Sequence, residues 1–99
     1  MKLLTEQIKA KLPKLYATED VPTKDKLLVC KFFTPDSSWT WYATEFDGKD
    51  TFFGYVQGFE NEWGYFTLNE LEDATGPMGL HIERDMYFEP TKFGEMFDN

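Results

Sequence analysis

His81, Glu83 and Asp85 are the residues whose types and spacing are best suited to chemistry. They alternate along residues 80–88, where most of the intervening side chains are apolar: Leu80, Ile82, Met86 and Phe88. Because alternate residues of a strand project from the same face, an imidazole and two carboxylates could converge there on a cation. This pattern supports one hypothesis of function, a small metal-dependent or hydrolytic enzyme. Side chains on one face are about 7 Å apart along a strand, so the simpler interpretation is a solvated polar face.

The remaining residues form no catalytic motif. Cys30 lies in the most apolar segment of the chain and has no histidine near it in sequence, which predicts a buried thiol rather than a nucleophile. His81 is the single histidine, so any Cys–His or Ser–His arrangement would have to use it. The glycines among the aromatic residues lie inside predicted strands rather than in a phosphate-binding loop. We therefore predict no catalytic, cofactor-binding or metal-binding residue, no cofactor and no enzymatic activity.

Aromatic side chains are unusually dense between Phe32 and Phe66, and such residues fit the pleated surface of a sheet. Turn-forming residues at 35–38, 47–50 and 60–62 divide this block into short pieces. We predict strands at residues 27–34, 39–46, 51–58, 63–67 and 80–88. The second and third of these strands pair as a hairpin.

The predicted hairpin carries large rings on both faces. Alternation places Trp39 and Trp41 on one face and Tyr42 and Phe46 on the other. If helices cover only one face of the sheet, the other exposes an aromatic patch typical of an interface. The alternative is that helices and the connection at residues 16–26 cover both faces.

Short helices are predicted around the sheet. Leu4, Ile8 and Leu12 form an apolar stripe beside Thr5, a suitable N-cap. Asn69 is the expected N-cap of a helix through residues 70–73, and residues 93–97 have helical spacing. The predicted fold class is α+β: a single domain over residues 1–99 with a mainly antiparallel, meandering β-sheet and short N-terminal, middle and C-terminal helices.

Charge and composition narrow the function classes. The 99 residues carry a net charge of −8, and the acidic excess falls after Lys31, with fourteen acidic against three basic residues. This excess disfavours direct binding to nucleic acid and favours a protein partner, basic or itself nucleic-acid-binding. No apolar run approaches the roughly 20 residues of a membrane span, and the N-terminus turns polar too early for a secretory signal. With one cysteine, a cytoplasmic protein without a membrane partner is expected.

Acidic residues and tryptophans are the candidate interaction residues. The carboxylates that fall in predicted turns and helix starts are Asp47, Asp50, Glu60, Glu62, Glu70, Glu72 and Asp73. Trp39 and Trp41 are the candidate aromatic contacts. The simpler interpretation of the acidic set is that it keeps the domain soluble.

The chain resembles a known family over nearly its whole length. The matching runs are Leu12–Asp20, Lys31–Pro35, Trp39–Tyr42, Asp50–Gly54, Gly64–Phe66 and Ile82–Asp85, with Leu68, Glu70 and Leu71. Together they are similar to small bacterial, plasmid and phage proteins described only as a domain of unknown function. The resemblance implies a mobile-element or phage setting, among DNA-maintenance and antirestriction genes, and it implies no catalytic residue.

The leading hypothesis of function combines this setting with the charge. It is a non-enzymatic protein-interaction module, an acidic inhibitor or mimic that acts on a nucleic-acid-binding host protein. The enzyme based on His81, Glu83 and Asp85 is the first alternative. An accessory domain that only dimerises is the second, and the oligomeric state stays open.

Overall fold

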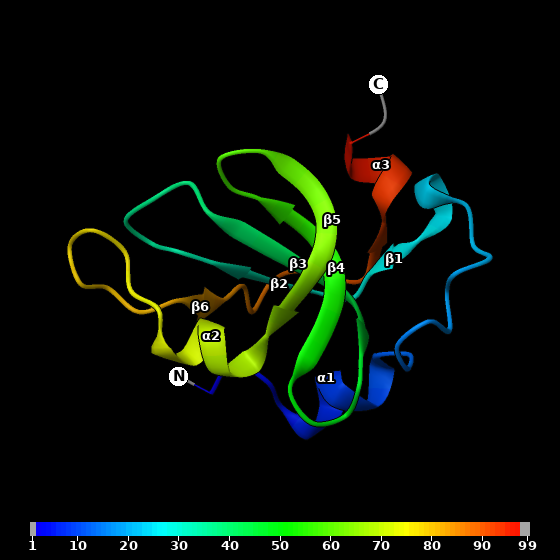
Figure 1. Cartoon of the computed structure of the whole chain (residues 1–99), viewed down its shortest axis with the longest axis horizontal. Helices are drawn as coiled ribbons and strands as arrows, with labels where there is room; N and C mark the ends of the chain where they lie inside the picture. Colours follow the sequence, from blue (N-terminus) through cyan, green and yellow to red (C-terminus); the bar gives the residue numbers. More distant parts are fainter. Residues whose placement is uncertain (1, 98–99) are drawn as a thin grey trace.

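The computed structural model describes residues 2–97, so Asp98, which the charge count includes, lies outside the described residues. Two antiparallel sheets form its centre (Figure 1). The larger has the order β5-β4-β3-β2-β6, with β2 Cys30–Phe33, β3 Thr40–Phe46, β4 Thr51–Gln57, β5 Asn61–Thr67 and β6 Glu83–Arg84. The smaller pairs β1 (Leu27–Leu28) with β7 (Thr91–Lys92).

The helices are short and lie around the strands. They are α1 (Glu6–Lys11), the 3-10 turn η1 (Thr23–Asp25), α2 (Leu68–Asp73) and α3 (Phe93–Phe97). Figure 1 shows α1 and α2 near one end of the large sheet and α3 near the other. None of the helices within residues 2–97 is long and apolar enough to cross a membrane. The predicted α+β class, with its antiparallel sheet and three short helices, is confirmed.

The central hairpin forms where it was expected, between β3 and β4. Its turn is held by Asp47, whose Oδ1 accepts the N–H groups of Lys49, Asp50 and Thr51 at 2.8, 2.8 and 3.1 Å. These bonds, that of Asp50 first, lower the pKa of Asp47. Gly48 supplies the positive φ of 88° that the turn requires.

Three predicted elements differ in their bounds. Residues 27–34 are two strands, because the chain leaves the large sheet before Val29 and β1 pairs with β7 instead. Residues 80–88 contain only the two-residue strand β6, since His81 before it makes an isolated bridge with Thr75 and a turn at 85–88 follows it. The N-cap of α2 is Thr67, not Asn69, because the Thr67 hydroxyl accepts the Glu70 N–H at 3.0 Å and donates to the Glu70 carboxylate at 2.9 Å.

One face of the sheet carries the main core. Phe52 is fully buried, and its ring lies 4.5–5.7 Å from those of Phe32, Phe46 and Phe66. The core also includes residues from the N-terminal segment, from α2 and from the chain before β6: Leu3, Leu4, Leu71 and Ile82. These contacts explain why the N-terminal segment, α2 and the chain before β6 pack against the strands.

A β-bulge in β3 changes which residues share a face. Trp41 pairs with Val56 and Phe46 with Phe52, while the register shifts between Ala43 and Glu45. The prediction that Tyr42 and Phe46 share a face is therefore wrong, because the extra residue turns Phe46 toward the core. The same shift places Glu45 opposite Phe53, on the other face of the sheet.

That other face is covered by the C-terminal segment. Tyr42, Tyr55 and Trp63 form a cross-strand row, and rings of α3 pack on it. Phe93 lies 4.8 Å from Tyr55, and Phe97 lies 5.5 Å from Tyr42. Both faces thus carry packed side chains, which was the alternative to an exposed aromatic face, and Tyr65 on β5 remains 57% exposed.

Candidate functional site

Glu45 is a buried carboxylate that holds a loop from far away in the sequence. It is only 3% exposed, and the bulge turns it out of the main core toward residues 13–22. Its Oε1 accepts the N–H of Tyr16 at 2.8 Å, and its Oε2 accepts the N–H of Thr18 at 3.0 Å together with the Thr18 hydroxyl. A buried charge needs such partners, so Glu45 and the loop stabilise each other.

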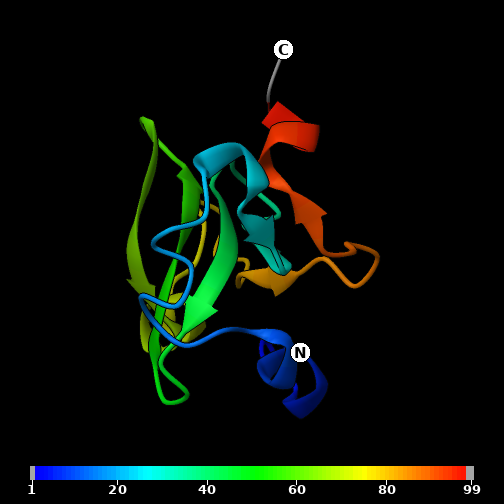
Figure 2. The same cartoon turned by 90° about the vertical axis from the view of Figure 1, so that its right-hand side faces the viewer.

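The loop has a strained residue at its centre. Tyr16 has a φ of 72°, a left-handed conformation that is uncommon for a bulky side chain and costs about 1–3 kcal/mol. Lys26 stabilises the part of the loop that follows Tyr16, because its Nζ donates a hydrogen bond to the Thr18 carbonyl oxygen. Figure 2 shows the loop, in blue, passing across the strands between α1 and η1. Strain of this kind persists only where the surroundings impose it, and here Glu45 imposes it.

A pocket of about 260 Å³ lies between this loop and the sheet. It is lined by Tyr16, Glu19, Lys26, Glu45, Phe53 and Tyr65. The rings of Phe53 and Tyr65 lie 5.2 Å apart. Tyr16 and Tyr65 remain 59% and 57% exposed, so the pocket is open to solvent with an aromatic lining. An open pocket lined by aromatic rings and a few charged groups is typical of a ligand-binding site.

The hydroxyl of Tyr65 is expected to titrate above its ordinary value. The hydrogen bond to Tyr16 raises the pKa of Tyr65 most, and the Glu45 and Glu19 carboxylates contribute. The neutral phenol is therefore favoured in the folded state, so its contribution to stability is complete below about pH 10 and is lost as the pH rises through the folded pKa. NMR titration of isotopically labelled tyrosine rings checks this, with Tyr16→Phe lowering the pKa of Tyr65. Tyr87→Phe is the control, and a Tyr65 pKa unmoved by Tyr16→Phe would contradict the assigned bond.

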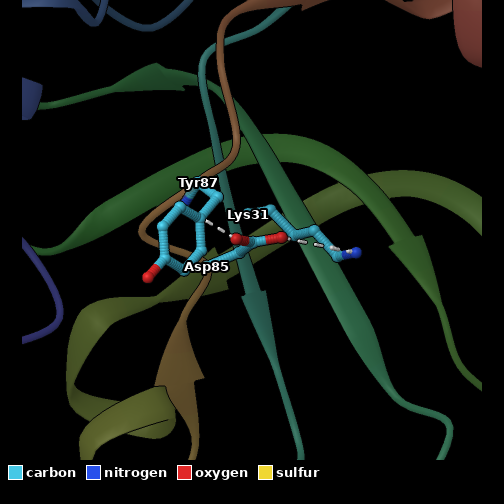
Figure 3. Close-up of polar contacts among 3 residues, drawn as sticks. All are labelled: Lys31, Asp85 and Tyr87. Carbon is cyan, nitrogen blue, oxygen red and sulfur yellow. Dashed lines mark hydrogen bonds and ion pairs between the residues drawn. The ribbon is translucent and has the colours of Figure 1, made fainter.

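His81, Glu83 and Asp85 do not converge. Asp85 lies beside Lys31, with 3.9 Å between Oδ2 and Nζ, and its Oδ1 accepts the Tyr87 N–H at 2.9 Å (Figure 3). Glu83 lines two surface pockets, one of about 600 Å³ that it shares with His81 and one of about 320 Å³ that it shares with Asp85. The predicted strand over residues 80–88 is wrong, because only Glu83–Arg84 form a strand within it. Across residues 2–97, no three His, Cys, Asp or Glu side chains are grouped so that they could hold a metal ion.

The predicted acidic residues divide into two groups. Asp47, Asp50 and Glu70 bind nearby backbone N–H groups or caps; Asp50 Oδ1, for example, accepts the Asn69 N–H at 2.8 Å. The others are exposed on the turn before β5, on β5 and on α2: Glu60, Glu62, Glu72 and Asp73. The first group shapes turns and helix starts, and the second is available for contact.

The contacts of the two candidate tryptophans and of the cysteine indicate roles in packing. Trp41 is half-buried and packs against the main core, and Trp39 stacks on it at 5.8 Å between ring centres. Trp39 also lies directly over Gly58, where a Cβ would come within 2.3 Å of the ring. Cys30 is buried, as predicted, and burial raises the pKa of its thiol to about 12. The thiol therefore stays protonated and is a poor nucleophile.

Sequence reasoning missed the residues of the loop pocket. Tyr16, Lys26, Glu45 and Tyr65 lie in four separate segments, and none belongs to a motif with a known spacing. Glu45 carried one signal, as the single charged residue of residues 40–46. The bulge that turns it toward the loop has no signature in the surrounding residues.

Comparison with known proteins gives a family and no function. The family described as "Protein of unknown function (DUF2958)" matches residues 3–95. No curated protein and no solved structure matches the chain. The resemblance seen in the sequence motifs is thereby confirmed at the level of the family, while the plasmid or phage setting stays a prediction. Because the match spans nearly the whole chain, the protein belongs to the DUF2958 family of proteins of unknown function.

Proposed function

We propose that the protein is a non-enzymatic interaction module of a mobile genetic element or phage. It binds a basic protein partner, a nucleic-acid-binding host protein whose phosphate-binding surface it occupies. One observation carries the proposal: the free edge of the large sheet, strand β5, lies in a part of the chain that has exposed carboxylates and no basic residue.

The charge of this region is of a single sign. Between Lys49 and Arg84 the sequence contains no lysine or arginine, and this stretch forms β4, β5 and α2. Its exposed carboxylates precede β5, lie on it and follow it: Glu60, Glu62, Glu70, Glu72 and Asp73. A row of negative charge attracts a surface built for phosphates, and it speeds the encounter with such a surface.

Strand β5 also offers main-chain hydrogen bonds. Among the strands of residues 2–97, it has β4 on one side and none on the other. The Gly58 N–H donates to the Glu60 carbonyl oxygen, and the Leu68 N–H donates to the Asp50 carbonyl oxygen. These bonds fix which residues of β5 direct their backbone groups toward β4, because such residues alternate along an antiparallel pair. By that alternation the backbone groups of Asn61, Trp63, Tyr65 and Thr67 point away from β4. An extended segment of a partner could therefore add to this edge.

Charge reversal tests the proposal. The tagged parent and two variants are used to capture proteins from a bacterial lysate, and the recovered proteins are identified. The test variant replaces four exposed acidic residues by lysine: Glu60, Glu62, Glu72 and Asp73. The control variant makes the same replacement at exposed positions elsewhere: Glu6, Asp20, Glu89 and Glu95. We expect the parent and the control to retain one basic partner and the test variant to lose it.

Stability and salt provide the accompanying measurements. Surface substitutions away from packed features change stability by less than about 0.5 kcal/mol, so the melting temperature should hardly move. Capture should weaken steeply as salt rises, because exposed charges are screened beyond about 8 Å at physiological ionic strength. A partner that binds the test variant as well as the parent would rule out the acidic surface. A partner lost equally by both variants would indicate general charge attraction instead.

A further inference from the structure

We propose that the pocket between residues 13–22 and strands β4 and β5 binds the guanidinium group of an arginine side chain. The inference rests on the proposed function in one respect, because it names the group by which a basic partner is recognised. The binding itself can be measured without that partner.

The lining of the pocket has the shape and chemistry that a planar cation needs. Three of its residues are aromatic: Tyr16, Phe53 and Tyr65. A cation near the face of such a ring is attracted by the ring quadrupole, and guanidinium additionally stacks as a flat group. The pocket volume of about 260 Å³ leaves space for the end of a long side chain.

The charged residues favour a positive ligand over a negative one. Two carboxylates, Glu19 and Glu45, line the pocket against one ammonium group, that of Lys26. Lys26 is held by the Thr18 carbonyl oxygen, and the Glu45 oxygens accept from the loop backbone. Glu19 is exposed, so its carboxylate can pair with a guanidinium in the two-pronged geometry that arginine prefers.

The position of Tyr65 connects the pocket to the edge of the sheet. Tyr65 belongs to β5, and its side chain lies beside Phe53 on β4 and lines the pocket together with Tyr16 of the loop. A partner segment paired along β5 would run next to the pocket. An arginine in that segment could then enter it, so main-chain pairing and side-chain recognition would reinforce each other.

Two capped tripeptides test the inference: Gly-Arg-Gly, and the same peptide with citrulline, which has the shape of arginine without the charge. Binding is followed by NMR through the backbone N–H signals of Thr18, Phe53 and Tyr65. We expect the arginine peptide to shift these signals saturably. The citrulline peptide should bind at least about tenfold more weakly, because a side chain without charge lacks both the ionic and the cation–π attraction.

Variants locate the site. Glu19→Gln should weaken binding of the arginine peptide by about threefold to tenfold. Asp20→Asn changes the net charge equally at the next residue, which does not line the pocket, and should leave the affinity unchanged. Tyr65→Phe keeps the ring face and should retain binding, whereas Tyr65→Leu should weaken it.

Two outcomes would overturn the inference. Equal binding of the arginine and citrulline peptides would remove the role of charge, and equal loss in Glu19→Gln and Asp20→Asn would show attraction without a site. Neither outcome touches the proposed function, which the capture experiment tests at other residues. Conversely, peptide binding at the pocket together with no captured partner would support the arginine site and contradict the proposed function.

Discussion

Gly54→Ala should prevent the protein from folding. A Cβ built on Gly54 would lie 1.8 Å from the carbonyl oxygen of Tyr42 and 3.0 Å from the Cα of Ala43. Both are backbone atoms of β3, so no side chain can move aside to make room. Ordinary overpacking costs about 1–3 kcal/mol, and here the central strand pair would have to separate as well. We expect no cooperative unfolding transition by circular dichroism.

Gly64→Ala is the matched control. Gly64 faces Gly54 across the β4–β5 pair, and a Cβ there would meet no atom within 4 Å. Replacing a glycine at a compatible position stabilises a protein by about 0.4–1 kcal/mol, because the unfolded chain loses freedom. The control should therefore melt at or above the temperature of the parent. Similar melting of both alanine variants would contradict the close approach of β3 and β4 at Gly54.

Glu45→Ala should lower the free energy of unfolding by about 3–5 kcal/mol, the range seen when one member of a buried charged interaction is removed. The substitution leaves three donors without their acceptor: the N–H groups of Tyr16 and Thr18 and the Thr18 hydroxyl. Each hydrogen bond to a charged group contributes about 1.5–3 kcal/mol. Glu45→Gln keeps one side-chain oxygen as an acceptor, so its free energy of unfolding should fall by less.

The loss of stability in Glu45→Ala should be greatest in the loop at residues 13–22. Denaturant unfolding measures the global change, and amide hydrogen exchange at Tyr16 and Thr18 measures the local one. Glu62→Ala is the control, because Glu62 is an exposed carboxylate in the neighbouring strand region. Its effect should stay within about 0.5 kcal/mol. If Glu45→Ala unfolded like the parent and kept slow exchange at Tyr16, the loop would not depend on this carboxylate.

The fold was predictable where local signals agreed with one another. Asp47 and Gly48 provide strong turn chemistry, so the hairpin of β3 and β4 could be placed from the sequence. Thr67 and Asn69 are both good N-caps, and local propensity does not decide between them. The pairing of Leu27–Leu28 with Thr91–Lys92 joins segments that are distant in the sequence, and no local rule gives it.

The candidate site was not predictable, for a physical reason. The alternation of His81, Glu83 and Asp85 is a local pattern, and the strand that it predicted over residues 80–88 is reduced to Glu83–Arg84, with a turn at 85–88 after it. The loop pocket is built from long-range contacts, and Glu45 reaches Tyr16 only because a bulge reverses its direction. Sequence patterns describe what neighbours do, whereas this pocket depends on a defect in the regular strand.

The cover provided by α3 has a consequence for synthesis. The chain leaves the ribosome N-terminus first, so all of β2 to β5 emerges before Phe93 and Phe97. Until those two rings are in place, a nascent sheet would expose the uncovered aromatic row of Tyr42, Tyr55 and Trp63. Co-translational folding of this domain therefore ends with its last helical turn, and a ribosome that stalled before that point would hold an aggregation-prone chain that attracts chaperones.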